Sequence, residues 1–132
     1  MKLHDYFEQT QGLGVLATAD QKGKVGIAVY ARPHVMEDGT LAFIMADRLT
    51  HHNLQSNPQA AYLFKEEGAG YKGKRLILTK IREEENSEML TALRKRTYSR
   101  KKEESEESKF LVFFKVAQEL PLVGSKSDRE KF

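Results

Sequence analysis

Apolar side chains near the amino end first recur at the helical spacing and then at the two-residue period of a strand. Three of them within Leu3–Phe7 stand at positions i, i+3 and i+4, which predicts a short helix. Apolar positions alternate over Gly12–Ala19, and Asp20–Gly23 has the composition of a hairpin turn. We therefore expect a hairpin whose second strand runs over Val25–Arg32 and is interrupted by Pro33.

The remainder of the pattern predicts more strands and two further helices. In chain order we expect strands over His34–Met36 and Thr40–Ala46, a helix from its N-cap Thr50 up to Pro58, strands over Gln59–Lys65 and Arg75–Arg82, a helix from Asn86 and Ser87 to about Tyr98 with the apolar stripe Met89, Leu90 and Leu93, and a strand over Phe110–Val116. Hairpins joined by tight turns, with two or three short helices inserted, indicate an antiparallel barrel rather than a parallel sheet.

Composition bounds the chain to one domain with limited chemistry. Its 132 residues match a prior of about 150 residues per domain, so residues 1–132 form one unit with a polar tail at 121–132. The absence of Cys excludes disulfides and thiolate metal sites. The longest apolar run, Leu41–Ala46, is far shorter than the roughly 20 residues that cross a bilayer. With no signal-peptide pattern in residues 1–20, we expect a cytoplasmic protein.

The net charge of +3 is not distributed like a nucleic-acid footprint. Six basic residues within 94–102 are followed at once by four glutamates within 103–107, which predicts a self-neutralising helix end and loop. We interpret Glu83–Glu85 as a solvated approach to the following helix. The aromatic side chains expected in the core or an interface, and so not free to stack on bases, are Phe43, Tyr62, Phe64, Phe110, Phe113 and Phe114.

Several motifs match a known pattern only in part. Gly68–Gly73 reads G-x-G-x-x-G, but a strand follows it where the dinucleotide fingerprint requires a helix, so it predicts a hairpin loop. His51 and His52 are adjacent on a predicted helix and diverge by about 100°, so we expect no metal site there. With no G-x-S-x-G, P-loop or H-E-x-x-H pattern, no catalytic residue can be named.

The most informative segment is Ile44–Asn53, where a strand turns directly into a helix. Unpaired amides at a helix start attract anions, which makes this segment a candidate phosphate site. Side-chain donors in it are Arg48, Thr50, His51 and Asn53. Nearby, Gly26 and Ala28 form a small strand face that lets a flat ring or a neighbouring backbone approach. The alternative is that the small residues only fill a barrel interior and the helix start holds no ligand.

Several segments in this order resemble the pyridoxamine 5′-phosphate oxidase-like, FMN-binding split-barrel family. They are Gly14–Thr18, Gly26–Tyr30, Asp38–Gly39, Leu41–Met45, Arg48–Tyr62 and Gly70–Lys80. The resemblance runs from about residue 10 to residue 120 and implies a mainly β fold, a six- to seven-stranded antiparallel split β-barrel. It also implies a homodimer with FMN at each end of the subunit interface.

The resemblance assigns cofactor contacts residue by residue. The positions that match the family's contacts to the FMN phosphate are Arg48, Thr50 and His51, and Asn53 falls where the family has Asn or Gln. The strand beside the flavin is matched by Ile44, Met45, Ala46 and Asp47. The segment that borders the isoalloxazine ring is matched by Ala28, Val29 and Tyr30. This chain departs from the family at Leu49, where no Lys is present, and Asp47 adds a negative charge.

The expected function is FMN binding, with a flavin-dependent oxidoreductase activity on an unknown small molecule. The family's substrate site for vitamin B6 lies partly in a carboxyl-terminal extension that this sequence lacks. Alternatives are a dimeric barrel that binds haem or a deazaflavin, and a module that binds another ligand or nucleic acid. A homodimer is also expected because a chain this short cannot enclose a flavin and because Phe110–Val116 is apolar on both faces.

Overall fold

The computed structural model describes residues 1–97 and 108–131, which fold into one antiparallel sheet with helices around it. The elements are α1 (Leu3–Gln9), β1 (Gly12–Ala19), β2 (Val25–Val29), β3 (His34–Val35), β4 (Leu41–Ala46), α2 (Leu49–Ser56), β5 (Gln59–Glu66), β6 (Gly73–Glu85), α3 (Glu88–Thr97), β7 (Lys109–Pro121) and the 3₁₀ helix η1 (Lys126–Lys131).

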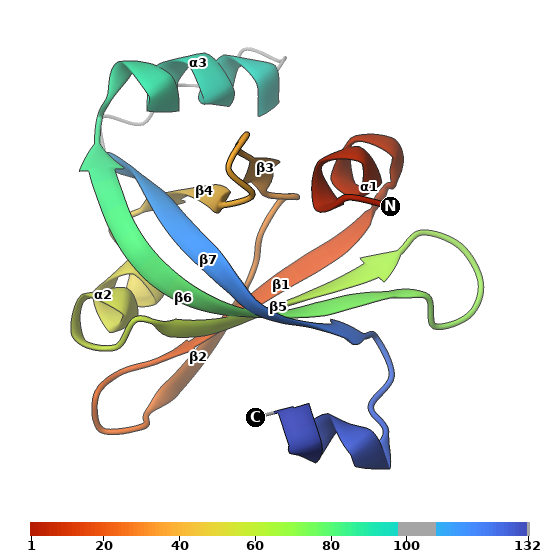
Figure 1. Cartoon of the computed structure of the whole chain (residues 1–132). Helices are drawn as coiled ribbons and strands as arrows, with labels where there is room; N and C mark the ends of the chain where they lie inside the picture. The colour runs from red at the N-terminus through yellow and green to blue at the C-terminus, as the bar shows by residue number, and fades with distance from the viewer. Residues whose placement is uncertain (98–107, 132) are drawn as a thin grey trace.

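The seven strands run in the order β2-β1-β5-β6-β7-β4-β3, and every pair is antiparallel. The sheet curls, but its edge strands β2 and β3 do not pair with each other, so the barrel is open on that side. Figure 1 shows α1 and α3 in the upper part of the view near the edge strand β3, α2 at the left and η1 below. The expected mainly β, antiparallel split barrel is confirmed.

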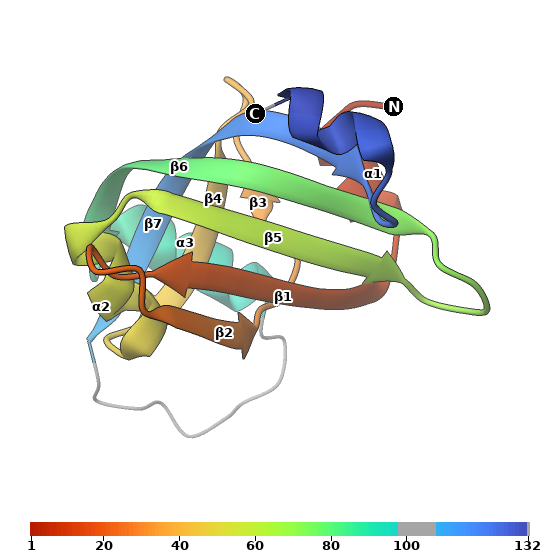
Figure 2. The ribbon, with the colours of Figure 1, turned by 90° about the horizontal axis from the view of Figure 1, so that it is seen from below.

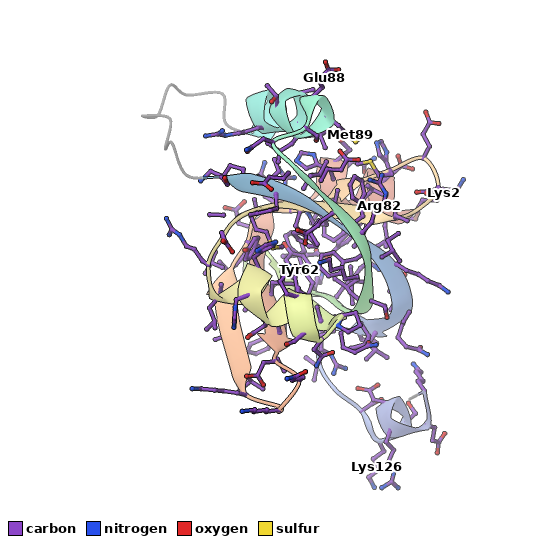
Figure 3. The ribbon with its side chains drawn as sticks, turned by 90° about the vertical axis from the view of Figure 1, so that its left-hand side faces the viewer. Lys2, Tyr62, Arg82, Glu88, Met89 and Lys126 are labelled. Atoms are coloured by element: carbon purple, nitrogen blue, oxygen red, sulfur yellow. The ribbon has the colours of Figure 1, made fainter. Side chains whose placement is uncertain are left out.

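Aromatic rings fill the interior of the barrel. Tyr62 lies at its centre (Figure 3), and the rings of Phe43 and Tyr62 are 5.0 Å apart between centroids. Phe43 makes an edge-on contact with Phe114, and Phe64 makes one with Phe7, so aromatic contacts run through the barrel interior. The six aromatic residues expected in the core or an interface are all buried.

Helix α3 covers a second, smaller apolar cluster on the outer side of the sheet. Leu90 and Leu93 are buried there, and the Ser87 hydroxyl accepts the amide of Leu90 as an N-cap. Met89, expected in the apolar stripe, is instead 45% exposed, so the buried stripe is narrower than predicted. The basic and acidic block predicted after Leu93 reaches into residues 98–107, outside the described residues.

Strand β7 is buried on both faces within this one chain. Phe110, Val112 and Phe114 point into the barrel, whereas Leu111 and Phe113 pack under α3. The expectation that its two apolar faces indicate a subunit contact is therefore corrected, because the chain's own helix covers the second face.

Three predicted boundaries also differ. Strand β2 ends at Val29 rather than at Arg32, because the chain turns away towards β3 before Pro33. Strand β6 extends through Glu83–Glu85, which pair with β7 and are not a solvated approach to a helix. Strand β7 continues to Pro121, and part of the predicted polar tail forms η1.

Candidate functional site

The start of α2 has no side-chain cap. Arg48 is the N-cap residue, with extended backbone angles, and its amide donates to Ala46 O at 2.9 Å. Thr50, predicted as the N-cap, is instead the second helical residue and is buried. The helix thus begins two residues earlier than expected, and the side chain of its N-cap residue makes no capping hydrogen bond to the first turn.

His51 lies buried between two carboxylates. Its Nδ1 is 2.8 Å from Asp47 Oδ1, and its Nε2 is 3.0 Å from Glu83 Oε2. The ring stacks on Phe110 with the two centroids 3.8 Å apart. These contacts engage both ring nitrogens and fix the orientation of the His51 ring between α2 and β6.

Glu83 is held by three donors. Lys80 Nζ donates to Oε1 at 2.6 Å and Gln55 Nε2 at 3.0 Å, in addition to His51. Partial burial alone raises the pKa of Glu83, but these hydrogen bonds outweigh it and lower the pKa to about 2. Gln55 Nε2 also lies 3.1 Å from the His51 carbonyl oxygen and 3.0 Å from His51 Nε2, so one amide group contacts both Glu83 and His51.

A β-bulge in β6 makes this network possible. Lys80 pairs with Phe114 and Arg82 with the next residue of β7, Phe113, so Ile81 is an extra residue in the ladder. Residues three apart normally face opposite sides of a strand. Because of the bulge, Lys80 and Glu83 both face α2, while Arg82 turns to the other side and lies 3.7 Å from the Phe113 ring centroid.

Sequence reasoning missed Lys80, Gln55 and Glu83 as members of this site. Their side chains are common surface types, and His51 and Glu83 are 32 positions apart in the chain. The extra residue in β6 puts Lys80 and Glu83 on the same face of the strand. The two-residue period of a strand gives no sign of such an extra residue.

The small face of β2 is filled by α2 itself. A Cβ on Gly26 would lie 3.0 Å from Leu49 Cδ2 and 3.3 Å from Asn53 Nδ2, so a larger residue would push the helix away. Asn53 in turn donates to Thr18 Oγ1 at 3.1 Å. The sequence predicted that a flat ring or a neighbouring backbone could approach at Gly26. In the structure, side chains of α2 occupy this place.

Tyr62 fixes the segment that follows β2. Its hydroxyl lies 3.2 Å from both Tyr30 O and Ala31 O, and burial raises the pKa of Tyr62, which keeps the donor proton in place. A Cβ on Gly14 would lie only 1.8 Å from the Tyr62 hydroxyl oxygen, so glycine is required there. The predicted ring-bordering residues are thereby held from inside the barrel.

A cavity of about 330 Å³ opens at the far end of β2, under α1 and α3. Its lining residues are His4, Phe7, Glu8, Ala31, Arg32, Pro33, His34, Val35, Met36 and Leu93. Arg32 Nη1 donates to Phe7 O at 2.7 Å and Thr10 O at 2.9 Å, which satisfies carbonyls at the end of α1 and fixes that wall.

The predicted site residues lie on β2, β4 and α2 or directly beside them. They are neighbours because α2 packs against β2 and β4, as well as against β1. Among the described residues, no group of three His, Cys, Asp or Glu side chains could hold a metal ion. In the same part of the chain, no helix has the length and apolar character needed to cross a membrane.

A family model described as pyridoxamine 5′-phosphate oxidase matches residues 2–120, which is most of the chain. The chain belongs to this family. None of the curated proteins matches it in sequence.

Solved structures of related fold have diverse ligands. An FMN-binding protein from Syntrophomonas wolfei subsp. wolfei superposes with a TM-score of 0.74 at 19% identity, over 95% of this chain and 86% of that one. An F420 reductase gives 0.69 at 14% identity, over 88% and 94%. A haem-binding protein from Mycobacterium smegmatis gives 0.54 at 17% identity, over 84% of this chain and 49% of that one. At these identities the likeness shows a shared fold.

The donor set at the start of α2 fits the phosphate end of a flavin nucleotide. An uncapped first turn offers backbone amides, and Arg48 at the N-cap adds an exposed cation. The side chains of His51 and Asn53 are bonded to neighbours in the barrel, so a phosphate here relies on the amides, Arg48 and Thr50. Whether each predicted residue contacts the cofactor stays a prediction.

Proposed function

We propose that this member of the pyridoxamine 5′-phosphate oxidase family binds FMN and acts as a flavin-dependent oxidoreductase on a small molecule. The observation that carries the proposal is the uncapped start of α2, with Arg48 at the N-cap, packed directly on β2. A helix start of this kind favours a phosphate through its amides and its dipole.

In this proposal the first-turn amides, Arg48 and Thr50 hold the phosphate. The ring lies along Ala28–Tyr30 and Ile44–Ala46, two segments that α2 and Tyr62 keep in place. Bound FMN supplies reversible electron acceptance, and the chain's residues bind, orient and shield it. No side chain is assigned as an acid or a base.

The cavity supports a reaction with a second molecule. Gly26 on β2 contacts α2, and Ala31, two residues after the end of the same strand, lines the cavity. A flavin anchored by its phosphate at α2 and lying along β2 extends towards this cavity. We place the small-molecule reactant there.

We also propose a homodimer through the outer face of β2, β1 and β5. Val25, Ile27 and Val29 of β2 are 78%, 75% and 70% exposed, and the register puts them beside the apolar outer face of β1. Leu13 and Leu63 extend the apolar surface. In Figure 2 no helix lies over these three strands. Exposed apolar surface of this extent is typical of an interface, and a second copy of the chain is the proposed partner.

The FMN proposal is tested by equilibrium dialysis of purified protein against FMN, riboflavin, F420 and haem, followed by visible absorption spectra. We expect retention of FMN with quenched flavin fluorescence, and weaker retention of riboflavin because it lacks the phosphate. Retention of F420 or haem in preference to FMN would replace FMN by that ligand. Retention of none of the four ends the proposal.

The dimer is tested by light scattering at micromolar concentration. We expect twice the chain mass for the wild type and a monomer for Ile27→Asp, because a charge is placed in the apolar face. Ile81→Asp is the matched control, since Ile81 is half exposed on β6 and outside the proposed interface. A monomeric wild type would contradict the dimer.

A further inference from the structure

We propose that His51 is a positioning residue that never touches the phosphate, and that by holding the Asp47 carboxylate it sets how strongly the α2 site prefers FMN over riboflavin. The inference rests on the proposed function. It replaces a direct contact, as the sequence suggested, by an indirect one.

The His51 ring has no donor left for a ligand. Its two nitrogens face Asp47 at 2.8 Å and Glu83 at 3.0 Å, and Phe110 covers one ring face. The residue is 5% exposed. A phosphate would have to break one of these charged bonds before it could accept a proton from the ring.

Asp47 is an internal competitor of the phosphate. It directly precedes the N-cap, and 64% of its side chain is exposed, so its carboxylate can reach the solvent near the uncapped first turn. A carboxylate at a helix start accepts hydrogen bonds from first-turn amides, and its charge repels a second anion. Bonded to His51, the same carboxylate is directed to the ring and away from the first-turn amides.

The opposite side of the ring is anchored to the barrel. Glu83 is bonded to Lys80 and Gln55, so His51 is fixed between β6 and the helix. The charged groups facing His51 are Asp47, Glu83 and Lys80, and Lys80 is paired with Glu83. Loss of the His51 ring therefore removes the partner of Asp47 and leaves its carboxylate free to turn towards the phosphate site.

The test compares dissociation constants for FMN and riboflavin in four proteins. For His51→Gln we expect FMN to bind about tenfold more weakly and riboflavin to bind as before. The reason is that the Asp47 carboxylate is no longer held at the His51 ring and repels the phosphate. Asp47→Asn should strengthen the preference for FMN, and the double variant Asp47→Asn/His51→Gln should recover FMN binding. His52→Gln, an exposed neighbour on the same helix, is the control and should match the wild type.

Three results would overturn the inference. Equal losses for FMN and riboflavin in His51→Gln would show a purely structural role. A loss of FMN that Asp47→Asn does not rescue would show direct contact with the phosphate. A preference in Asp47→Asn that is unchanged or lower would show that Asp47 does not oppose the anion, and this variant decides the matter even if His51→Gln fails to fold.

A ligand-free measurement separates this inference from the proposed function. In ¹⁵N-labelled protein without flavin, inorganic phosphate should leave the ring nitrogen signals of His51 unchanged, while it shifts the amides of Leu49 and Thr50. If neither flavin binds but these signals behave so, the FMN proposal fails and the anion site stands. A phosphate-induced shift of the His51 ring signals overturns the inference.

Discussion

Helices α2 and α3 are similar in length and both pack on the barrel, yet they differ in the polar side chains that they bury. Helix α3 buries Leu90 and Leu93, whereas α2 buries Thr50, His51 and Asn53 beside a single leucine, Leu54. Buried polar groups are tolerated only when they are bonded, so α2 depends on named partners in β1 and β6. Helix α3 needs only apolar side chains that fill the space against the sheet, so its role is to stabilise the fold. The polar side chains that we propose to act at the ligand site lie on α2.

The largest effect expected from this contrast is on stability in α3. Leu90→Ala should lower the free energy of unfolding by about 2–5 kcal/mol, because a fully buried leucine is replaced by a cavity. Chemical denaturation measures it, with Met89→Ala as the exposed control that should stay within about 0.5 kcal/mol. The ratio of FMN to riboflavin affinity should not change. A change in that ratio would show that α3 also affects ligand binding at α2.

The second effect is on ligand binding at α2. Arg48→Ala should weaken FMN by about 1.5–3 kcal/mol, the range for a lost charged hydrogen bond, and leave riboflavin unchanged. Titration calorimetry with both flavins measures it, and denaturation checks that stability is preserved. Equal FMN affinities of the variant and the wild type would remove Arg48 from the site.

The third effect sharpens the contrast through pH. The pKa of Glu83 is lowered from 4.5 to about 2 in the folded chain, so its ionised form stabilises the fold above pH 4.5, and that contribution is lost as the pH falls towards 2. Glu83→Gln should therefore be less stable than the wild type by about 1–2 kcal/mol at neutral pH, and the difference should shrink below pH 4.5.

Denaturation of both proteins between pH 2 and 7 measures this difference, and the exposed Glu85→Gln is the matched control. A difference that is constant over the whole pH range would show that the charge of Glu83 does not support α2.

The sequence predicted the strands whose pattern is local. Gly12–Ala19 has the predicted bounds because its alternation and the following turn are both short-range signals. The same holds for the loop at Gly68–Gly73, which joins β5 to β6 as expected. The N-cap of α2 was placed at Thr50 because threonine is a common cap, whereas the helix begins two residues earlier, directly after Arg48.

Long-range features could not be read from local patterns. The apolar run at β7 was interpreted as facing a partner, since nothing in it indicates that α3 covers its outer side. The alternation of β2 predicted two faces but not which of them stays exposed. The candidate site residues on β4, β2 and α2 do come together, but the partners of His51 depend on tertiary contacts that the sequence does not display.

The bulge at Ile81 has an evolutionary consequence. Deleting this one residue would restore the regular ladder of β6 and leave Lys80 and Glu83 on the same face, two positions apart, without changing any other side chain. A relative one residue shorter at this point would therefore keep the network with its Lys and Glu spaced by two. A relative of the same length with a regular ladder would instead turn its Glu away from the His, so the spacing in this strand marks which relatives share the arrangement.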